Sequence, residues 1–99
     1  MTYRFRADLW VHHGGSWHFV TVPFDEADEI DEVSTASSAV RGWGSVRVRV
    51  TIGSSTWDTS LFPDSKAKSF VLPIKKPVRV AEGLTVGEPV EVAVELLDV

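Results

Sequence analysis

Apolar and polar residues alternate along several short segments of the chain, which is the period-two pattern of strands that bury one face. Residues 45–52 show the pattern most clearly, because Val46, Val48 and Val50 alternate with arginine or threonine. Residues 90–96 repeat it, with valines and a leucine on one side and glutamates on the other. We therefore expect two strands whose valines face one shared interior.

Four further segments complete a set of about six predicted strands, at residues 3–11, 17–22, 56–62 and 69–72. Residues 13–16, His-Gly-Gly-Ser, form a turn sequence that joins the first two into a hairpin. Short strands with one apolar face must bury those faces together, and closure of the sheet removes exposed edges. The sequence therefore predicts a mainly β fold, a single closed six-stranded β-barrel with two short helices.

The two helices are predicted from different signals. One helix is predicted at residues 25–33, because acidic side chains are concentrated at its start, where the helix dipole favours negative charge. The same residues also carry a narrow apolar stripe. The Ser/Ala/Thr-rich segment 34–39 that follows is expected to be a surface loop. Further on, Pro77 suits a first helical position and Gly83 suits the position just past a helix end. These two residues bracket a helix of one to two turns.

Length and composition fit one cytoplasmic domain that spans residues 1–99. Hydrophobic residues make up 43% of the 99 residues and charged residues 24%, an ordinary globular composition. Cysteine is absent, which excludes disulfides, thiolate metal sites and cysteine nucleophiles. We see neither an apolar secretion signal nor a run of about 20 apolar residues that could cross a bilayer. The remaining aromatic side chains, apart from those discussed below, are expected in the core.

The charge of the chain is unevenly distributed, although its formal net value is only −4. Residues 41–80 hold eight basic and two acidic residues, whereas the segments on either side are acidic. Such a chain can present a basic face despite its acidic total. The alternative is that the charged segments pair with each other, for example Arg47 and Arg49 with Glu91 and Glu95 on a neighbouring strand.

A basic and aromatic rim is the main candidate binding site. Lysines and an arginine surround the predicted start of the second helix, where free N–H groups also attract anions. A tryptophan in a Gly-Trp-Gly setting adds a ring that can stack on a planar ligand. The alternative is that the lysines are merely solvated and the tryptophan plugs the barrel end. The candidate ligand-binding residues are Arg41, Trp43, Ser60, Phe62, Lys75, Lys76 and Arg79, within residues 41–45, 60–62 and 75–79.

Other chemistry has little support in the sequence. His12, His13 and His18 cluster near a turn, but no carboxylate or thiolate follows at ligand spacing, so we predict no metal and no cofactor. The acidic run of residues 25–32 lacks the ligand ladder of a calcium loop. No Gly-x-Ser-x-Gly motif is present, and no serine has an evident base. We therefore name no catalytic residue and do not expect an enzyme.

Several motifs, in this order, carry a family resemblance. They include Trp-His-Phe-Val at residues 17–20, Gly-Trp-Gly-Ser-Val at 42–46, Thr-Ser-Leu-Phe-Pro at 59–63 and Leu-Pro-Ile-Lys-Lys at 72–76. Over nearly its whole length the chain resembles the family called domain of unknown function 1905. The resemblance implies a six-stranded closed barrel and no particular activity. Pro77 stands where alanine is more usual in the family, but a proline also fits a helix start.

A shorter resemblance covers residues 71–95, which are similar to the half-barrel of swapped-hairpin DNA-binding proteins and antitoxins. The shared frame is a strand, a proline, a short basic helix, Gly83-Leu84, and Gly87-Glu88 before a valine-rich strand. This similarity concerns the way a barrel is built and does not imply a shared ligand.

Three functional hypotheses follow from the sequence. The leading one is a non-catalytic module that presents its basic and aromatic rim to an anionic small molecule or a partner protein. The second is a nucleic-acid-binding barrel, favoured by the basic middle segment and the half-barrel resemblance. The third is a small enzyme that acts through Asp58, Asp64 or a histidine in a pocket.

Overall fold

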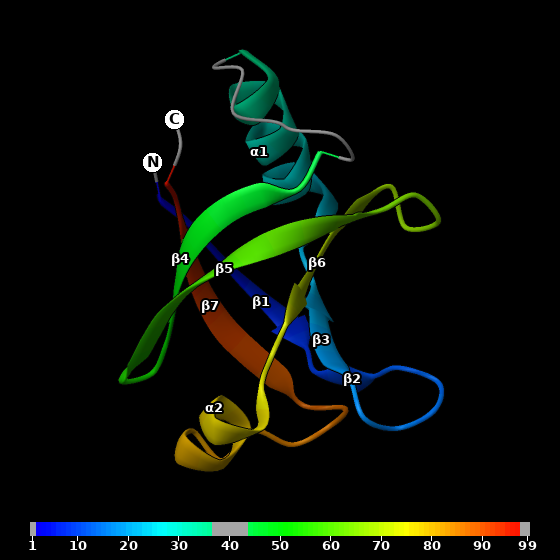
Figure 1. The fold of residues 1–99 in the computed structure, drawn as a ribbon, viewed down its shortest axis with the longest axis vertical. Coiled ribbons are helices and arrows are strands. Elements are labelled where there is room, and N and C mark those ends of the chain that lie inside the picture. Colours follow the sequence, from blue (N-terminus) through cyan, green and yellow to red (C-terminus); the bar gives the residue numbers. More distant parts are fainter. Residues whose placement is uncertain (1, 37–43, 98–99) are drawn as a thin grey trace.

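The computed structural model of the chain describes residues 2–36 and 44–97. Strands predominate, and the mainly β class predicted from the sequence is confirmed. Two helices interrupt the strands, one in each half of the chain (Figure 1). The elements follow in the order β1 (Thr2–Asp8), β2 (Trp10–Val11), β3 (His18–Thr21), α1 (Phe24–Ala36), β4 (Val46–Ile52), β5 (Ser55–Asp64), β6 (Ser69–Pro73), α2 (Lys76–Ala81) and β7 (Pro89–Leu96).

The strands form one curled antiparallel sheet in the order β1-β7-β4-β5-β6-β3-β2. The sheet is a half-barrel that does not fully close, so the prediction of a closed six-stranded barrel is wrong in its closure and in its count. The single predicted strand 3–11 divides into β1 and β2. Strand β1 pairs with β7, with Tyr3 opposite Val94, whereas β2 pairs with β3, with Trp10 opposite Phe19.

The division falls at Leu9, which is held by the turn before β7. The Leu9 amide donates to the Glu88 carbonyl over 3.1 Å, and the Leu9 carbonyl accepts from the Gly87 amide over 2.8 Å. These bonds replace strand pairing at this position, and the Leu9 side chain is buried in the core. The N-terminal segment therefore passes from one edge of the sheet to the other within one residue.

The core lies inside the curl and is built by alternate residues of nearly every strand. The predicted alternation is confirmed in β4 and β7, whose valines and flanking Ile52 and Leu96 are all buried. Their charged neighbours point outward. Further buried side chains come from the other strands, from the residues just past β3 and β6, and from α1, including Phe5, Val20, Val22, Ile30, Leu61, Phe70, Leu72 and Ile74.

Helix α1 is longer than predicted and covers one end of the curl (Figure 1). Ala27 and Ile30 are buried against the core, while most of the acidic side chains face outward. Residues 34–36, predicted to be loop, form the last helical turn, in which Ser34 is also buried. The rest of that predicted loop, 37–39, lies outside the described residues. Because the side chain of Ser34 is small, the helix can continue close to the sheet at a position where the Ser/Ala/Thr-rich sequence favours a loop.

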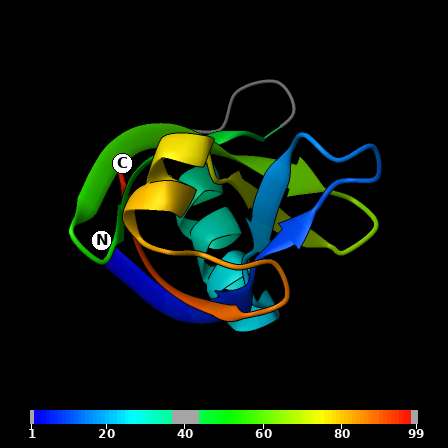
Figure 2. The same cartoon turned by 90° about the horizontal axis from the view of Figure 1, so that it is seen from below.

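Helix α2 forms where Pro77 and Gly83 bracket it. Lys75, in extended backbone, precedes the helix, Pro77 lies in its first turn, and Gly83 follows with φ of +62°. Helices α1 and α2 lie at opposite ends of the molecule (Figure 1). Viewed from the α2 end, the strands curve around the axis on which the helices lie (Figure 2).

Candidate functional site: an aromatic face on the outside of the sheet

The described residues of the predicted rim come from separate elements: Ser60 and Phe62 lie on β5, whereas Lys76 and Arg79 lie on α2. Arg41 and Trp43 lie outside the described residues. Gly44, the residue after Trp43, lines a hollow beside Asp28 of α1. Residues 75–79, by contrast, lead into α2 and form most of it, at the opposite end of the molecule (Figure 1). The sequence showed that each segment lies near a strand end but not which end of the curl each strand reaches.

The basic residues around α2 have different surroundings. Lys75 and Lys76 are exposed. Arg79 is half-buried, and its Nη1 donates to the Ile74 carbonyl over 2.7 Å. This bond ties the helix to the chain that leads into it, so the Arg79 side chain has a structural role here.

Ser60 and Phe62 lie on the outer face of β5, away from the core. Phe62 is 45% exposed and stands opposite Val71 of β6. Phe62 joins a group of mostly aromatic and apolar side chains from four neighbouring segments, which we call the aromatic face. The aromatic face consists of His12, Trp17, Phe19, Phe62, Val71 and Pro73, and it surrounds a hollow of about 340 Å³.

The strand pairing explains why these side chains share one face. Val20 and Val22 point into the core, so Phe19, which directly precedes Val20 in the strand, must point outward. Phe19 stands opposite Pro73 on one side and Trp10 on the other. The prediction that Trp17 belongs to the core is wrong, because its side chain is 59% exposed. The alternation of residues around the apolar Val20 already indicated in the sequence that Trp17 points away from the core.

The rings of the aromatic face support one another. The Trp17 and Phe19 rings are nearly parallel, at 12°, with centroids 6.1 Å apart, and Trp10 packs on Phe19 at 5.0 Å. Such offset pairs are favoured by the quadrupoles of the rings. Trp10 is held in turn by a 2.9 Å hydrogen bond from its Nε1 to Thr21 Oγ1. The exposed Trp17 ring therefore rests on a supported aromatic base.

Positive charge borders the aromatic face. The Nη1 of Arg47 donates to the hydroxyl of Ser60, two residues from Phe62 on the same side of β5, over 3.3 Å. Lys75 follows Pro73 by two residues in extended backbone, with φ of −73° and ψ of 155°, and its side chain is exposed. None of the six residues of the aromatic face is acidic.

The sequence profile of the domain of unknown function DUF1905 matches residues 5–94. The chain belongs to the DUF1905 family. The match begins within β1 and ends within β7, and it confirms the resemblance predicted from the motifs. No match was found among the curated proteins. The family description assigns no activity, so the geometry of this DUF1905 domain carries the functional argument.

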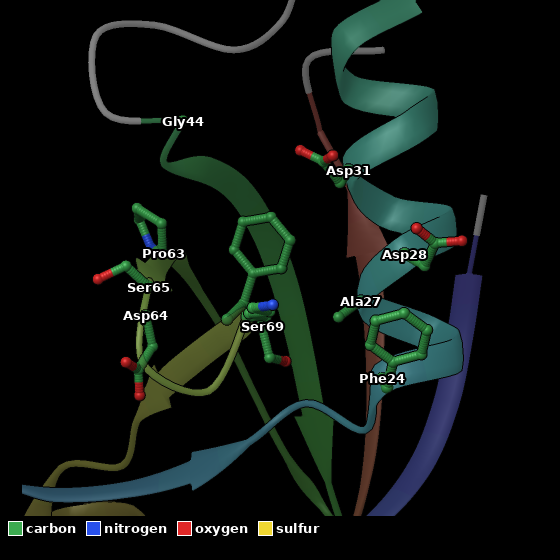
Figure 3. A pocket seen from close by; sticks show the side chains of 11 residues that line it. Phe24, Ala27, Asp28, Asp31, Gly44, Pro63, Asp64, Ser65 and Ser69 are labelled. Carbon is green, nitrogen blue, oxygen red and sulfur yellow. The ribbon is translucent and has the colours of Figure 1, made fainter.

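A second hollow of the DUF1905 domain, of about 480 Å³, lies between α1 and the turn from β5 to β6 (Figure 3). Phe24 and Ala27 of α1 face Pro63 and Ser69 across it. Its charged lining is mostly acidic, with Asp28, Asp31 and Asp64 against Lys68. This electrostatic character is opposite to that of the predicted anion site.

The outer face of β1, β7 and β4 in the DUF1905 domain carries charges of both signs. Arg4, Thr51 and Ala93 line two adjoining hollows, of about 480 and 200 Å³. In the sheet register, Arg6 stands opposite Glu91 and Arg49 opposite Glu95. Of the two predicted pairings with these glutamates, that of Arg49 with Glu95 matches the register, while Glu91 faces Arg6 in place of Arg47.

Arg49 makes its close contact with Asp58 on the other side. Its Nε and Nη2 donate to the two carboxylate oxygens over 2.8 and 3.2 Å. This contact lowers the pKa of Asp58. Asp64 accepts from the amides of Lys66 and Ala67 in the following turn. Both aspartates named as enzyme candidates therefore have structural contacts.

Two further groups of the DUF1905 domain have shifted pKa values. Burial, reinforced by nearby Glu29, raises the pKa of the Tyr3 phenol. The hydroxyl of Ser55, and secondarily the amide and hydroxyl of Ser54, lower the pKa of Glu82. Within residues 2–36 and 44–97, no three His, Cys, Asp or Glu side chains gather at metal-binding distance. The helices of these ranges are too short or too polar to span a membrane.

Proposed function

We propose that the chain is a cytoplasmic, non-catalytic binding module whose contact surface is the aromatic face. Its ligand is a planar ring system that carries a negative charge. The observation that supports this proposal is the exposure of Trp17 and Phe62 on opposite sides of one apolar hollow. The proposal keeps the expected anionic ligand but moves its site from the rim to the outside of β3, β5 and β6.

Exposure of large rings on a supported surface is the first argument. An exposed apolar patch on a small soluble domain marks a binding site more often than a scattered apolar residue does. Trp17 and Phe62 gain little for folding from their exposed area, whereas a ligand that covers them removes that area from water. Aromatic rings also add a preference for flat partners that stack on them.

The charge around the hollow is the second argument. Arg47 contacts Ser60, which lies two residues before the lining residue Phe62, and Lys75 follows the lining residue Pro73 by two residues. The hydrogen bond of the Arg47 side chain goes to a neutral hydroxyl, and its charge also acts on Asp58, whose main partner is Arg49. The guanidinium of Arg47 therefore keeps N–H groups that can bind an anion. Of the residues predicted from sequence, Ser60, Phe62 and Lys75 therefore belong to the proposed site. Lys76 and Arg79 have no part in it.

The experiment that tests the proposal uses the indole N–H signals of the ¹⁵N-labelled chain. Planar anions, such as nucleoside monophosphates and aromatic carboxylates, are added one at a time. A ligand should shift the Trp17 signal and leave the signal of half-buried Trp57 in place. Phe62→Ala should weaken that binding, whereas Phe24→Ala, an exposed phenylalanine on α1, should not. The proposal is wrong if no planar anion moves Trp17, or if Phe24→Ala and Phe62→Ala have equal effects.

A further inference from the structure

We propose that the planar anion recognised by the aromatic face is single-stranded nucleic acid. Its bases stack on Trp17 and Phe62, and its phosphates lie against Arg47 and Lys75. This inference rests on the proposed function and names the ligand class of the same site.

The arrangement of the rings favours a strand over a single flat molecule. Trp17 and Phe62 come from segments far apart in the sequence and flank the hollow, so the face offers two exposed rings rather than one. Each can stack a separate base of one strand. Stacking accepts any base, because every base has a π face, and contributes about 1–3 kcal/mol per base when measured by alanine substitution.

The position of the cations fits a chain of phosphates. Arg47 lies on β4, beside Ser60, and Lys75 lies beyond the end of β6. The two cations thus come from separate segments, one on β4 and one just before α2. A guanidinium can bind a phosphate through two N–H groups, and an ammonium acts as a point charge. The nearby Asp58 carboxylate is already held by Arg49, which limits its repulsion of a phosphate.

A single strand fits this face better than a duplex does. Bases in a duplex stack on each other and hide their faces, whereas unpaired bases can be splayed onto aromatic side chains. The aromatic face presents rings and apolar side chains, and its polar groups are the His12 imidazole and the Trp17 indole N–H. It therefore fits the faces of bases and lacks the set of donors and acceptors that reads base edges in a groove.

The test is fluorescence anisotropy with labelled single strands of DNA and RNA about 12 nucleotides long, beside a duplex of the same sequence. The single strands should bind, and the duplex should bind more weakly. Trp17→Ala and Phe62→Ala should each weaken binding at least about fivefold, which corresponds to the lower limit for one stacked base. If two phosphates are neutralised, log K should fall with log salt with a slope near −1.4 between about 50 and 200 mM salt.

Matched variants separate the aromatic face from general charge. Arg47→Gln and Lys75→Gln should each reduce the slope by about 0.7, because each removes one phosphate contact. Arg4→Gln, which removes one charge from the outer face of β1, and Phe24→Ala should leave affinity within about twofold in the same assay. Circular dichroism of each variant shows whether it is folded.

Three results would overturn the inference. The first is no binding of either single strand at low salt. The second is equal or tighter binding of the duplex, and the third is full retention of binding in the Trp17→Ala, Phe62→Ala double variant. If a nucleoside monophosphate or an aromatic carboxylate shifts the Trp17 signal while single strands do not bind, the inference fails and the proposed function stands. If a proline-rich peptide shifts Trp17 and no planar anion does, both fail.

Discussion

The carboxylate of Glu82 accepts a 2.6 Å hydrogen bond from the hydroxyl of Ser55, which fastens the end of α2 to the turn between β4 and β5. Ser54 donates to the same carboxylate over 3.3 Å. Helix α2 is only six residues long and has no fully buried side chain, so its other attachments are the partly buried Val78 and the hydrogen bond from Arg79 to Ile74. The contact joins two elements 27 residues apart in the chain.

Replacement of Glu82 by glutamine should therefore lower the free energy of unfolding at neutral pH. It should also make the free energy of unfolding fall less when the pH is lowered. The pKa of Glu82 is below its ordinary value of 4.5 in the folded chain, so the contribution is present above that pH and is lost as the pH falls below it. Urea unfolding of both proteins at pH 7 and near pH 3 measures the effect. Glu32→Gln, on the exposed side of α1, is the control. Equal acid sensitivity of Glu82→Gln and the parent would contradict the prediction.

Gly53→Ala should destabilise the chain more than Gly83→Ala does. Both glycines have positive φ, +57° and +62°. An alanine in this left-handed backbone conformation lowers stability by about 1–2 kcal/mol. A Cβ on Gly53 would also overlap Oε1 of Glu82, whereas a Cβ on Gly83 meets nothing within 4 Å. Thermal unfolding of the two variants isolates the overlap. The explanation fails if the two melting temperatures drop by the same amount.

Leu72→Ala should cost about 2–5 kcal/mol of unfolding free energy, because it leaves a cavity at a fully buried position of β6. Val80→Ala is the comparison, since Val80 is 70% exposed on α2, and its effect should be within about 0.5 kcal/mol. Chemical denaturation gives both values. If Leu72→Ala lowered the free energy of unfolding as little as Val80→Ala does, the assignment of Leu72 to the core would be wrong.

Asp58→Asn should reduce stability only slightly, and the loss should shrink as salt is added. The ion pair with Arg49 is exposed on both sides, so water and salt screen it. Asp58 has a lowered pKa, so its contribution is present above the ordinary value of 3.8 and disappears below it. A double-mutant cycle with Arg49→Gln, at low and high salt, measures the coupling. A coupling that is independent of salt would argue against a screened surface pair.

Local patterns predicted much of the fold. The valines of β4 and β7 identified a shared interior, and Pro77 with Gly83 bracketed α2 correctly. Strand β5 extends through Pro63 and Asp64, beyond the predicted strand 56–62, because pairing with Phe70 and Ser69 of β6 outweighs the turn preference of these residues. Such pairing involves another part of the chain and leaves no local signature.

The candidate site was less predictable than the fold. Lys75 and Phe62 were selected for charge and aromaticity, but the sequence did not reveal that Trp17 and Phe19 lie beside Phe62. The alternation of Val20 and Val22 indicated that Phe19 points outward. The order of β3, β6 and β5 in the sheet was needed to bring these rings together, and that order depends on pairing between distant segments.

The pairing of β1 with β7 joins residues 2–8 to residues 89–96. During synthesis, the first of these strands leaves the ribosome long before its partner exists. Contacts between such distant segments slow folding, because the loop that joins them must close before the contacts form. We therefore expect the nascent domain to acquire its native structure only after residue 96 has emerged, in one late cooperative step, and to need protection of its first strand until then.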